Sequence, residues 1–266
     1  MSLRARPLRF WAQAAVTLAV CAFLVVPVGL SILAGITENF FLGLKSGLTL
    51  RWIGEVWSLY SGTVAMSIGV ALGCLAITLA IGIPAAYALA RVQNRWTRAF
   101  EELLVLPVAV PGLATALALI LLYGGWRDFR ASPMFILVGH VLFTLPFMVR
   151  SVLAVMLAVD LRTLEEAAAS LGAGFARRFL SVVLPNAAPG ILAGSLMVVT
   201  LSLGEFNLTW MLHTPLTRTL PVGLADSYAS MRLEIGSAYT LIFFVIIIPL
   251  LVAMQWASQR AQSRRA

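Results

Sequence analysis

Charged residues are scarce in this sequence. Only 11% of its 266 residues are Asp, Glu, Lys or Arg, whereas roughly a quarter of a soluble domain is charged. Hydrophobic residues make up 61% of the chain, and its mean hydropathy is +0.95. This balance excludes a soluble domain and indicates an integral membrane protein. Alternating segments of about ten residues, which a membrane β-barrel requires, are also missing, so we expect an all-α helical bundle.

Cysteine and histidine number only two each. Cys21 and Cys74 lie inside apolar runs, where a structural disulfide is not expected. His140 and His213 lie on different segments, and no Cys/His cluster has the spacing of a metal site. A G-x-S-x-G nucleophile motif is absent as well. We therefore expect no metal site, and an intramembrane enzyme is disfavoured.

A phosphate-binding loop of the form G-x-x-x-x-G-K-[ST] is also absent. The single lysine, Lys45, lacks the glycines that this motif places before it. We therefore expect no ATPase site and no cofactor in this chain. The net charge of +8 does not indicate a nucleic-acid partner, because the arginines lie in short loops and at the ends of apolar runs rather than in a stripe with aromatics.

Six apolar segments are long enough for a helix to cross a hydrocarbon core about 30 Å thick. They are residues 11–36, 62–90, 103–123, 133–158, 187–212 and 237–256. No polar stretch between them is long enough for a separate soluble domain, so we expect one transmembrane domain over residues 1–266. Six crossings place both termini on one side, and the longest loop on that side is 159–186.

Basic residues are unevenly divided between the two sides of this six-helix bundle. With both termini inside, the inner side holds Arg4, Arg6, Arg9, Arg91, Arg95, Arg98, Arg162, Arg177, Arg178, Arg260, Arg264 and Arg265. The outer side holds Lys45, Arg51, Arg127, Arg130, Arg218 and Arg232. Short loops rich in arginine stay on the cytoplasmic side, so we expect a cytoplasmic N-terminus and a cytoplasmic C-terminus.

The inner loop has its own helical signals. Thr163 and Glu166 have the spacing of a capping box, which predicts a helix that begins at Thr163. Gly172 follows where a glycine in the left-handed conformation can end that helix. A second amphipathic run, 175–183, is predicted to stop at Pro185. The result is a helix-turn-helix on the cytoplasmic face, which composition alone does not distinguish from an ordinary interfacial connector.

This loop resembles the E-A-A signature of permease subunits of binding-protein-dependent ABC importers. The matching residues are Glu166-Ala167-Ala168, Gly172, Val182 and Leu184-Pro185, in the spacing of the family, with Val182 where isoleucine is usual. The resemblance implies a type I importer permease in a bacterial inner membrane, whose first loop helix is a coupling helix that sits in a groove of the ATPase subunit. Carried over, the coupling residues are Leu164, Glu165, Glu166, Ala167, Ala168, Ala169, Ser170, Leu171 and Gly172.

The same resemblance implies the partners of the chain. These are an ATPase subunit that binds ATP and Mg, a substrate-binding protein outside, and a second permease subunit, identical or different. Residues 204–224, with Thr219-Leu220-Pro221-Val222-Gly223-Leu224, are similar to permeases of the polyamine, aminoethylphosphonate and ferric-iron or thiamine branch. A carboxylate at Glu205 suits an amine, so a polyamine or aminoalkylphosphonate is the expected solute, although the binding protein sets specificity more than the permease does.

Glu205 and Asn207 are the most unusual polar pair in a predicted crossing. An ionised carboxylate there is costly unless it faces a cavity or a partner, so we expect both residues to line the translocation path. The alternative for Glu205 is a place at the outer interface. His140 is a further path candidate, with a hydrogen-bonded packing role as its alternative. Arg150 is expected to extend its side chain to the inner surface.

Three prolines in the predicted crossings are candidate gate hinges, because proline frees a backbone carbonyl and permits a kink. They are Pro107, Pro111 and Pro146. The alternative function is an ion-gradient-driven secondary transporter that uses His140, Glu205 or Arg150. The loop signature disfavours this alternative.

Overall fold

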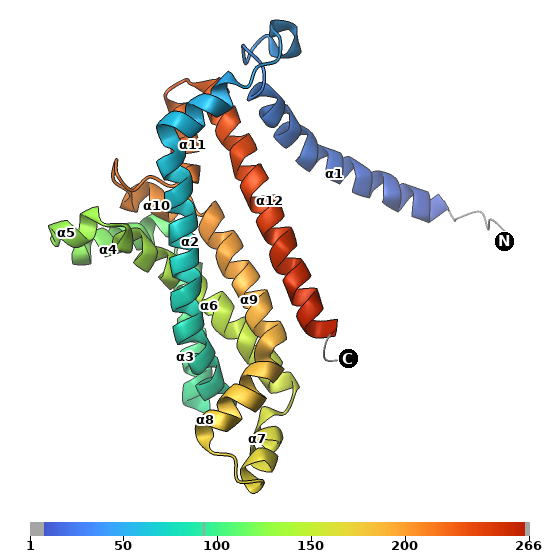
Figure 1. The fold of residues 1–266 in the computed structure, drawn as a ribbon, viewed down its shortest axis with the longest axis vertical. Coiled ribbons are helices and arrows are strands. Elements are labelled where there is room, and N and C mark those ends of the chain that lie inside the picture. The colour runs from blue at the N-terminus through green and yellow to red at the C-terminus, as the bar shows by residue number, and fades with distance from the viewer. Residues whose placement is uncertain (1–7, 93, 264–266) are drawn as a thin grey trace. The chain divides into compact units, whose positions relative to one another are not determined.

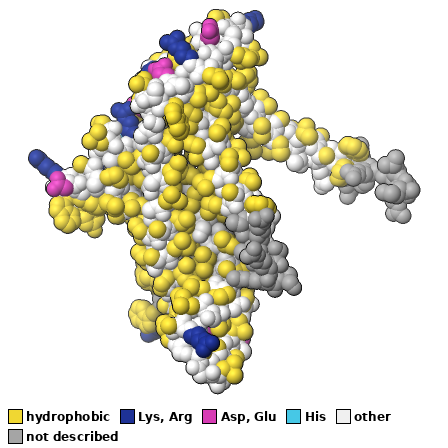
Figure 2. Space-filling model, in the orientation of Figure 1, with side chains coloured by type: hydrophobic (Ala, Val, Ile, Leu, Met, Phe, Trp, Pro, Cys, Tyr) yellow, Lys and Arg dark blue, Asp and Glu magenta, His cyan; other side chains and the backbone are white. Residues whose placement is uncertain are grey.

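The computed structural model describes residues 8–92 and 94–263, and these are almost entirely helical, with no β-strand among them (Figure 1). The prediction of an all-α fold is therefore confirmed. Four arginines of the charge count, Arg4, Arg6, Arg264 and Arg265, lie outside the described residues. On the face shown in Figure 2, hydrophobic side chains cover most of the helical surface, as expected of helices that contact lipid.

Five helical runs in the described residues are long and apolar enough to cross a membrane. They are α1 (Leu8–Ala34), α2 (Arg51–Arg91), α6 (Pro133–Ala158), the continuous run 175–204, and α12 (Leu233–Ser263). The run 175–204 consists of α8 (Phe175–Arg178), a π-helical turn η2 (Phe179–Val183) and α9 (Leu184–Gly204). A bent pair, α3 (Arg95–Ala109) and α4 (Gly112–Tyr123), supplies a sixth span if it is counted as one.

Two of the predicted crossings are broken helices. The segment 103–123 divides into α3 and α4, whose axes differ in direction by 99°. The segment 187–212 divides into α9 and the short helix α10 (Asn207–Leu212), with Glu205 and Phe206 between them. Broken helices are tolerated at membrane depth only where the freed backbone groups are paired or face a cavity.

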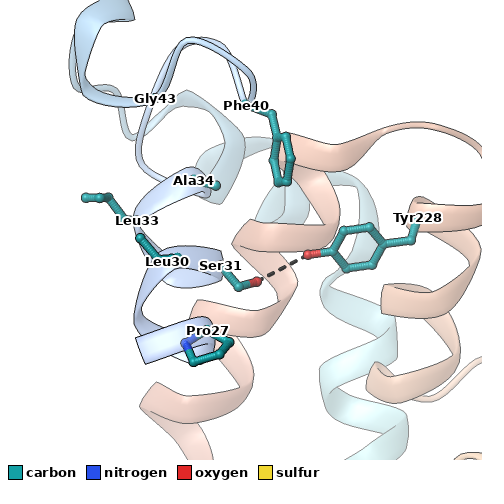
Figure 3. Close-up of a pocket in the computed structure, with 8 residues that line it drawn as sticks. All are labelled: Pro27, Leu30, Ser31, Leu33, Ala34, Phe40, Gly43 and Tyr228. Carbon is teal, nitrogen blue, oxygen red and sulfur yellow. Dashed lines mark hydrogen bonds between the residues drawn. The ribbon is translucent and has the colours of Figure 1, made fainter. Parts of the chain in front are cut away.

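The chain divides into two compact units, residues 1–60 with 224–244, and residues 61–223 with 245–266. In the first unit, the end of α1 meets the start of α12 at a glycine: a Cβ on Gly35 would lie 2.8 Å from the Ser237 carbonyl oxygen. Tyr228, on α11 (Leu220–Ala229), places its hydroxyl 3.2 Å from both Ser31 Oγ and Ser237 Oγ. Figure 3 shows Ser31 and Tyr228 pointing toward one another beside an apolar hollow.

An ion pair and two side-chain hydrogen bonds also stabilise the first unit. Arg232 forms an ion pair with Glu55 and donates a hydrogen bond to the Tyr60 hydroxyl at 2.7 Å. The Phe40 N–H donates to Glu234 Oε1 at 2.9 Å, which fixes the segment before the 3₁₀ turn η1 (Gly43–Ser46). Most of α1 is exposed, because none of its 18-residue apolar window is buried against other described parts of the chain.

The second unit is built on close packing of α6 against α9, which lie side by side (Figure 1). Small residues permit this approach: a Cβ on Gly190 would lie only 2.5 Å from the Ser151 carbonyl oxygen and 3.0 Å from Val152 Cα. Ser151 Oγ donates to the Gly190 carbonyl at 2.9 Å. Small residues and an interhelical hydrogen bond are the usual means of association between helices in a membrane, where lipid removes the hydrophobic driving force.

Candidate functional site

The first loop helix, α7 (Leu161–Ser170), begins earlier than predicted. Asp160 precedes it in the left-handed conformation (φ +43°), and Thr163 Oγ1 donates to Asp160 Oδ2 at 2.7 Å. Glu166 Oε1 accepts a hydrogen bond from Arg162 Nε at 2.9 Å. The predicted capping box is therefore wrong, because Thr163 and Glu166 both have nearer side-chain partners. The bond to Glu166 raises the pKa of the exposed Arg162 above its ordinary value.

The end of α7 is as predicted. Gly172 adopts a left-handed conformation, with φ of +81°. The Ala173 N–H donates to the Ala168 carbonyl at 3.1 Å, and the Gly172 N–H donates to the Ala169 carbonyl at 2.9 Å. These two bonds form a Schellman motif, which satisfies carbonyls that a helix end otherwise leaves unpaired. The chain turns sharply here, and α8 follows at Phe175.

Pro185 does not end the second loop helix. The helix continues through η2 into α9, and Pro185 occupies the first turn of α9. A proline inside a helix cannot donate to the helical ladder, and the π-helical turn before Pro185 changes the helical register at that point. The second loop helix and the crossing that follows are therefore one continuous run.

Neighbouring glutamates on α7 point in opposite directions. The side chain of Glu166 is 67% exposed, whereas that of Glu165 is 3% exposed. On the outward side, Leu164, Ala167 and Leu171 are exposed at positions i, i+3 and i+7, and Leu171 is 90% exposed. These three residues, called the apolar ridge below, lie along one face of the helix.

The inward glutamate connects α7 to the end of α2. Glu165 Oε1 accepts a hydrogen bond from the Tyr87 hydroxyl at 2.7 Å, and Glu165 Oε2 lies 3.8 Å from Arg91 Nε. The Tyr87 hydroxyl in turn accepts from Arg91 Nη1 at 3.0 Å. Phe175 and Phe179 pack against the Tyr87 ring, with centroid distances of 6.2 and 5.3 Å. The loop is thus fixed to the bundle through buried polar and aromatic contacts.

A second candidate site lies where the two broken helices meet. A cavity of about 250 Å³ is bounded on one side by residues 107–112, which span the break between α3 and α4. Glu205, Asn207 and Leu208, at the break between α9 and α10, form the other side, and Phe143 of α6 contributes to the wall. The predicted path residues Glu205 and Asn207 therefore both line a cavity.

Glu205 also caps α10. Its Oε1 accepts from the Leu208 N–H at 2.8 Å, and its Oε2 accepts from the Thr209 N–H at 2.8 Å and from Thr209 Oγ1 at 2.7 Å. The side chain is 9% exposed. These contacts stabilise a carboxylate at the cavity wall, because each donor carries a partial positive charge.

His140 lies behind Glu205 and does not line the cavity. It is 1% exposed, and its ring nitrogens contact Ser202 Oγ and Thr209 Oγ1, both at 2.8 Å. Because Thr209 donates to the Glu205 carboxylate, it must accept from His140 Nε2, which leaves Nδ1 to accept from Ser202. These contacts place His140 behind the cavity wall as a hydrogen-bonded residue, and its place on the translocation path stays a prediction.

The three predicted hinge prolines occupy different settings. Pro111 lies at the break itself, immediately before α4, and Pro107 lies within α3 on the cavity wall. Pro146 is buried inside α6, which runs without interruption from Pro133 to Ala158. Only the first two prolines therefore adjoin the cavity. Arg150, near the end of α6, is exposed.

Reasoning from the sequence did not find Tyr87, Arg91 or Thr209. Tyr87 and Arg91 lie four residues apart at the end of a long apolar segment, where an aromatic residue and an arginine are usually read as interfacial anchors. Thr209 lies four residues after Glu205, which is the spacing of a side-chain contact on a helix. The contact between Glu205 and Thr209 could therefore have been predicted from their spacing in the sequence.

Comparison with known proteins gives the family. Residues 78–263 match the family model described as the binding-protein-dependent transport system inner membrane component. The putrescine transport system permease protein PotI of Escherichia coli is 28% identical, over 91% of this chain and 89% of its own length. The sulfate transport system permease protein CysW of Synechocystis is 27% identical, over 78% of this chain and 80% of its own length.

The fold is shared with a solved structure as well. A chain in the crystal structure of a bacterial ABC transporter involved in the import of the acidic polysaccharide alginate superposes with a TM-score of 0.69, covering 95% of this chain and 96% of that one at 15% identity. At that identity the likeness concerns the fold alone. Family, relatives and fold agree: the chain belongs to the inner membrane components of binding-protein-dependent transport systems, as a multi-pass permease subunit of an ABC importer.

Proposed function

We propose that this chain forms half of the translocation pathway of an ATP-driven importer and receives the motion of an ATPase subunit through α7. The observation that carries the proposal is the two-sided structure of α7. Its exposed side chains include the apolar ridge and Glu166, while Glu165 on the buried side fixes it to the bundle. Leu171, the C-cap of α7, is 90% exposed, and together with Leu164 and Ala167 it forms a contiguous apolar surface that suits a groove on a partner.

In this proposal α7 is cytoplasmic, and so are both termini. The excess of arginine on that side supports the orientation. The partner that holds α7 is the ATPase subunit, which binds ATP and Mg. Closure of that subunit moves a short rigid helix as a body, and the helix passes the motion to the membrane segments. A substrate-binding protein delivers the solute on the opposite face.

A second permease subunit completes the pathway. The apolar window of α1 is without cover, and the cavity at the two helix breaks is bounded by one chain on only some of its sides. Both features are explained if another permease, identical or different, packs against this one. The pathway then runs between the two subunits.

The solute is proposed to be a small polar amine, such as a polyamine or an aminoalkylphosphonate. Two relatives with nearly equal sequence identity to this chain are named for putrescine, a cation, and for sulfate, an anion. They therefore do not decide the charge of the solute. The cavity does favour a cation, because Glu205 places a carboxylate in its wall and the described cavity residues include no Lys or Arg. An amine donates to the remaining lone pairs of that carboxylate, whereas an oxyanion is repelled by it.

Reconstitution tests this function. The chain is placed in proteoliposomes with its ATPase subunit, its second permease and its binding protein, and uptake of labelled putrescine and of labelled sulfate is followed with and without ATP. We expect putrescine uptake that requires ATP and the binding protein. Uptake that proceeds without ATP in response to an ion gradient would support a secondary transporter instead, and uptake of sulfate alone would contradict the proposed solute.

Replacing Glu205 by Gln tests the proposed path. The variant keeps the shape of the side chain but removes its charge and one of its acceptor oxygens, so we expect putrescine uptake to fall by about tenfold or more, as when a hydrogen bond to a charged group is lost. The measurement is initial uptake rate at equal protein content. Asn207→Ala alters the second predicted path residue in the same wall without altering charge, so comparison of the two variants separates the effect of the carboxylate from that of the wall. Unchanged uptake and unchanged substrate-stimulated ATP hydrolysis in E205Q would limit Glu205 to capping α10.

A further inference from the structure

We infer that Glu165, Tyr87 and Arg91 form a joint that carries motion from α7 directly into α2. This inference rests on the proposed function, in which α7 is the helix that meets the ATPase subunit. It assigns separate roles to the two neighbouring glutamates of α7. Glu166 contacts the ATPase subunit, and Glu165 is a positioning residue that transmits the motion of α7 to α2.

The order of donors in the joint is fixed by chemistry. An arginine can only donate and a carboxylate can only accept, so the Tyr87 hydroxyl accepts from Arg91 Nη1 and donates to Glu165 Oε1, at 3.0 and 2.7 Å. The hydroxyl oxygen of Tyr87 is therefore hydrogen-bonded both to the guanidinium of Arg91 on α2 and to the carboxylate of Glu165 on α7. Loss of this one oxygen removes both hydrogen bonds while leaving the ring in place, so that the two charges are then connected only by the ion pair of 3.8 Å between Arg91 Nε and Glu165 Oε2.

Packing makes the joint rigid. Tyr87 is 8% exposed and Glu165 is 3% exposed, so neither side chain has room to change position independently of its helix. Phe179 meets the Tyr87 ring edge-on at 5.3 Å, and the Arg91 guanidinium lies over the same ring at 5.6 Å. The ring is thus enclosed by the second loop helix and by its own helix, with the hydroxyl directed at α7.

The joint has a defined mechanical consequence. The loop is also continuous with α9 through the run 175–204, so a displacement of α7 reaches one span through the chain itself. Tyr87 and Glu165 supply a second route, into the 41-residue helix α2, which no short covalent connection provides. Because packed helices move as bodies, the two attachments carry a displacement of the loop into both α2 and α9.

The test separates docking from transmission. E165Q and Y87F are prepared with the double variant and with E166Q as the matched neighbour. For each, we measure the affinity for the ATPase subunit in detergent and the solute taken up per ATP hydrolysed in proteoliposomes. We expect E165Q and Y87F to bind the ATPase subunit as wild type does, but to transport at least about tenfold less per ATP, because E165Q removes the charge of the acceptor and Y87F removes the donor hydroxyl. E166Q should show the reverse, with weaker binding.

The double variant should lose less than the sum of the two single losses, because E165Q removes the charge and Y87F removes the hydroxyl of the same hydrogen-bonded group. Normal uptake per ATP in E165Q and Y87F would overturn the joint. So would a loss of ATPase binding in E165Q equal to that in E166Q, since Glu165 would then only shape the docking loop. If E165Q does not fold, Y87F decides, because it keeps the buried ring. Failure of the wild-type chain to bind any ATPase subunit would instead overturn the proposed function.

Discussion

A chain that carries Leu164→Asp and Leu171→Asp is expected to lose ATPase binding and uptake while it still folds and inserts. Leu171 is 90% exposed and Leu164 is 38% exposed, so the substitutions disturb packing within the chain only at the covered part of Leu164. Burial of a leucine in a partner groove contributes about 1.5–3 kcal/mol, so removing two raises the dissociation constant by at least about 100-fold. Titration with the purified ATPase subunit in detergent measures this change.

The matched control for this prediction is Leu164→Met with Leu171→Met. It conserves apolar character and volume, so binding should stay within about threefold of wild type, since such exchanges cost less than 1.5 kcal/mol. If the aspartate chain binds the ATPase subunit as tightly as the methionine chain does, the apolar ridge is not the docking face. Size-exclusion profiles of both chains establish that they are folded.

Replacing Gly190 by Ala is expected to have the largest effect on stability. The added Cβ would lie 2.5 Å from the Ser151 carbonyl oxygen and 3.0 Å from Val152 Cα, both backbone atoms that no side-chain rotation can move. The helices α6 and α9 must then separate, which also breaks the bond from Ser151 Oγ to the Gly190 carbonyl. We expect a loss of about 3 kcal/mol, the upper end for an overpacked core.

Thermal unfolding in detergent and the monodisperse fraction after extraction measure this effect. Gly69→Ala is the control, because a Cβ at Gly69 meets nothing within 4 Å. Both substitutions raise helix propensity equally, so any difference between them reflects packing. Equal thermal stability of G190A and G69A would mean that α6 and α9 do not pack as closely as described.

Much of the fold follows from hydropathy. The crossing predicted over 133–158 coincides with α6, because an uninterrupted apolar run of that length has no other stable structure in lipid. The two helix breaks did not follow in the same way. Gly204 and Pro111 stand at the breaks, yet Pro146 and Pro185 stand within continuous helices. A proline permits a break, and tertiary contacts such as the capping of α10 by Glu205 decide whether one forms.

In the loop 159–186, too, some features follow from the local sequence and others depend on tertiary contacts. Gly172 ends α7 as its position predicts, because a Schellman motif is a local structure. The capping box failed because Asp160 lies close enough to take the Thr163 hydroxyl. The different surroundings of Glu165 and Glu166 could not be predicted from adjacent identical residues. Their difference depends on Tyr87, which lies 78 positions away in the chain.

A site-specific crosslink tests the central claim most directly. A photoreactive residue is placed at Leu171, at the end of the apolar ridge, and a second chain carries it at Leu216, which is 88% exposed and lies in a segment predicted to be outside. Both chains are irradiated in their native membrane, and captured proteins are identified by mass spectrometry. The account predicts that the chain labelled at 171 captures an ATPase subunit and that the chain labelled at 216 does not. Capture of the ATPase subunit at 216, or of none at 171, would contradict it.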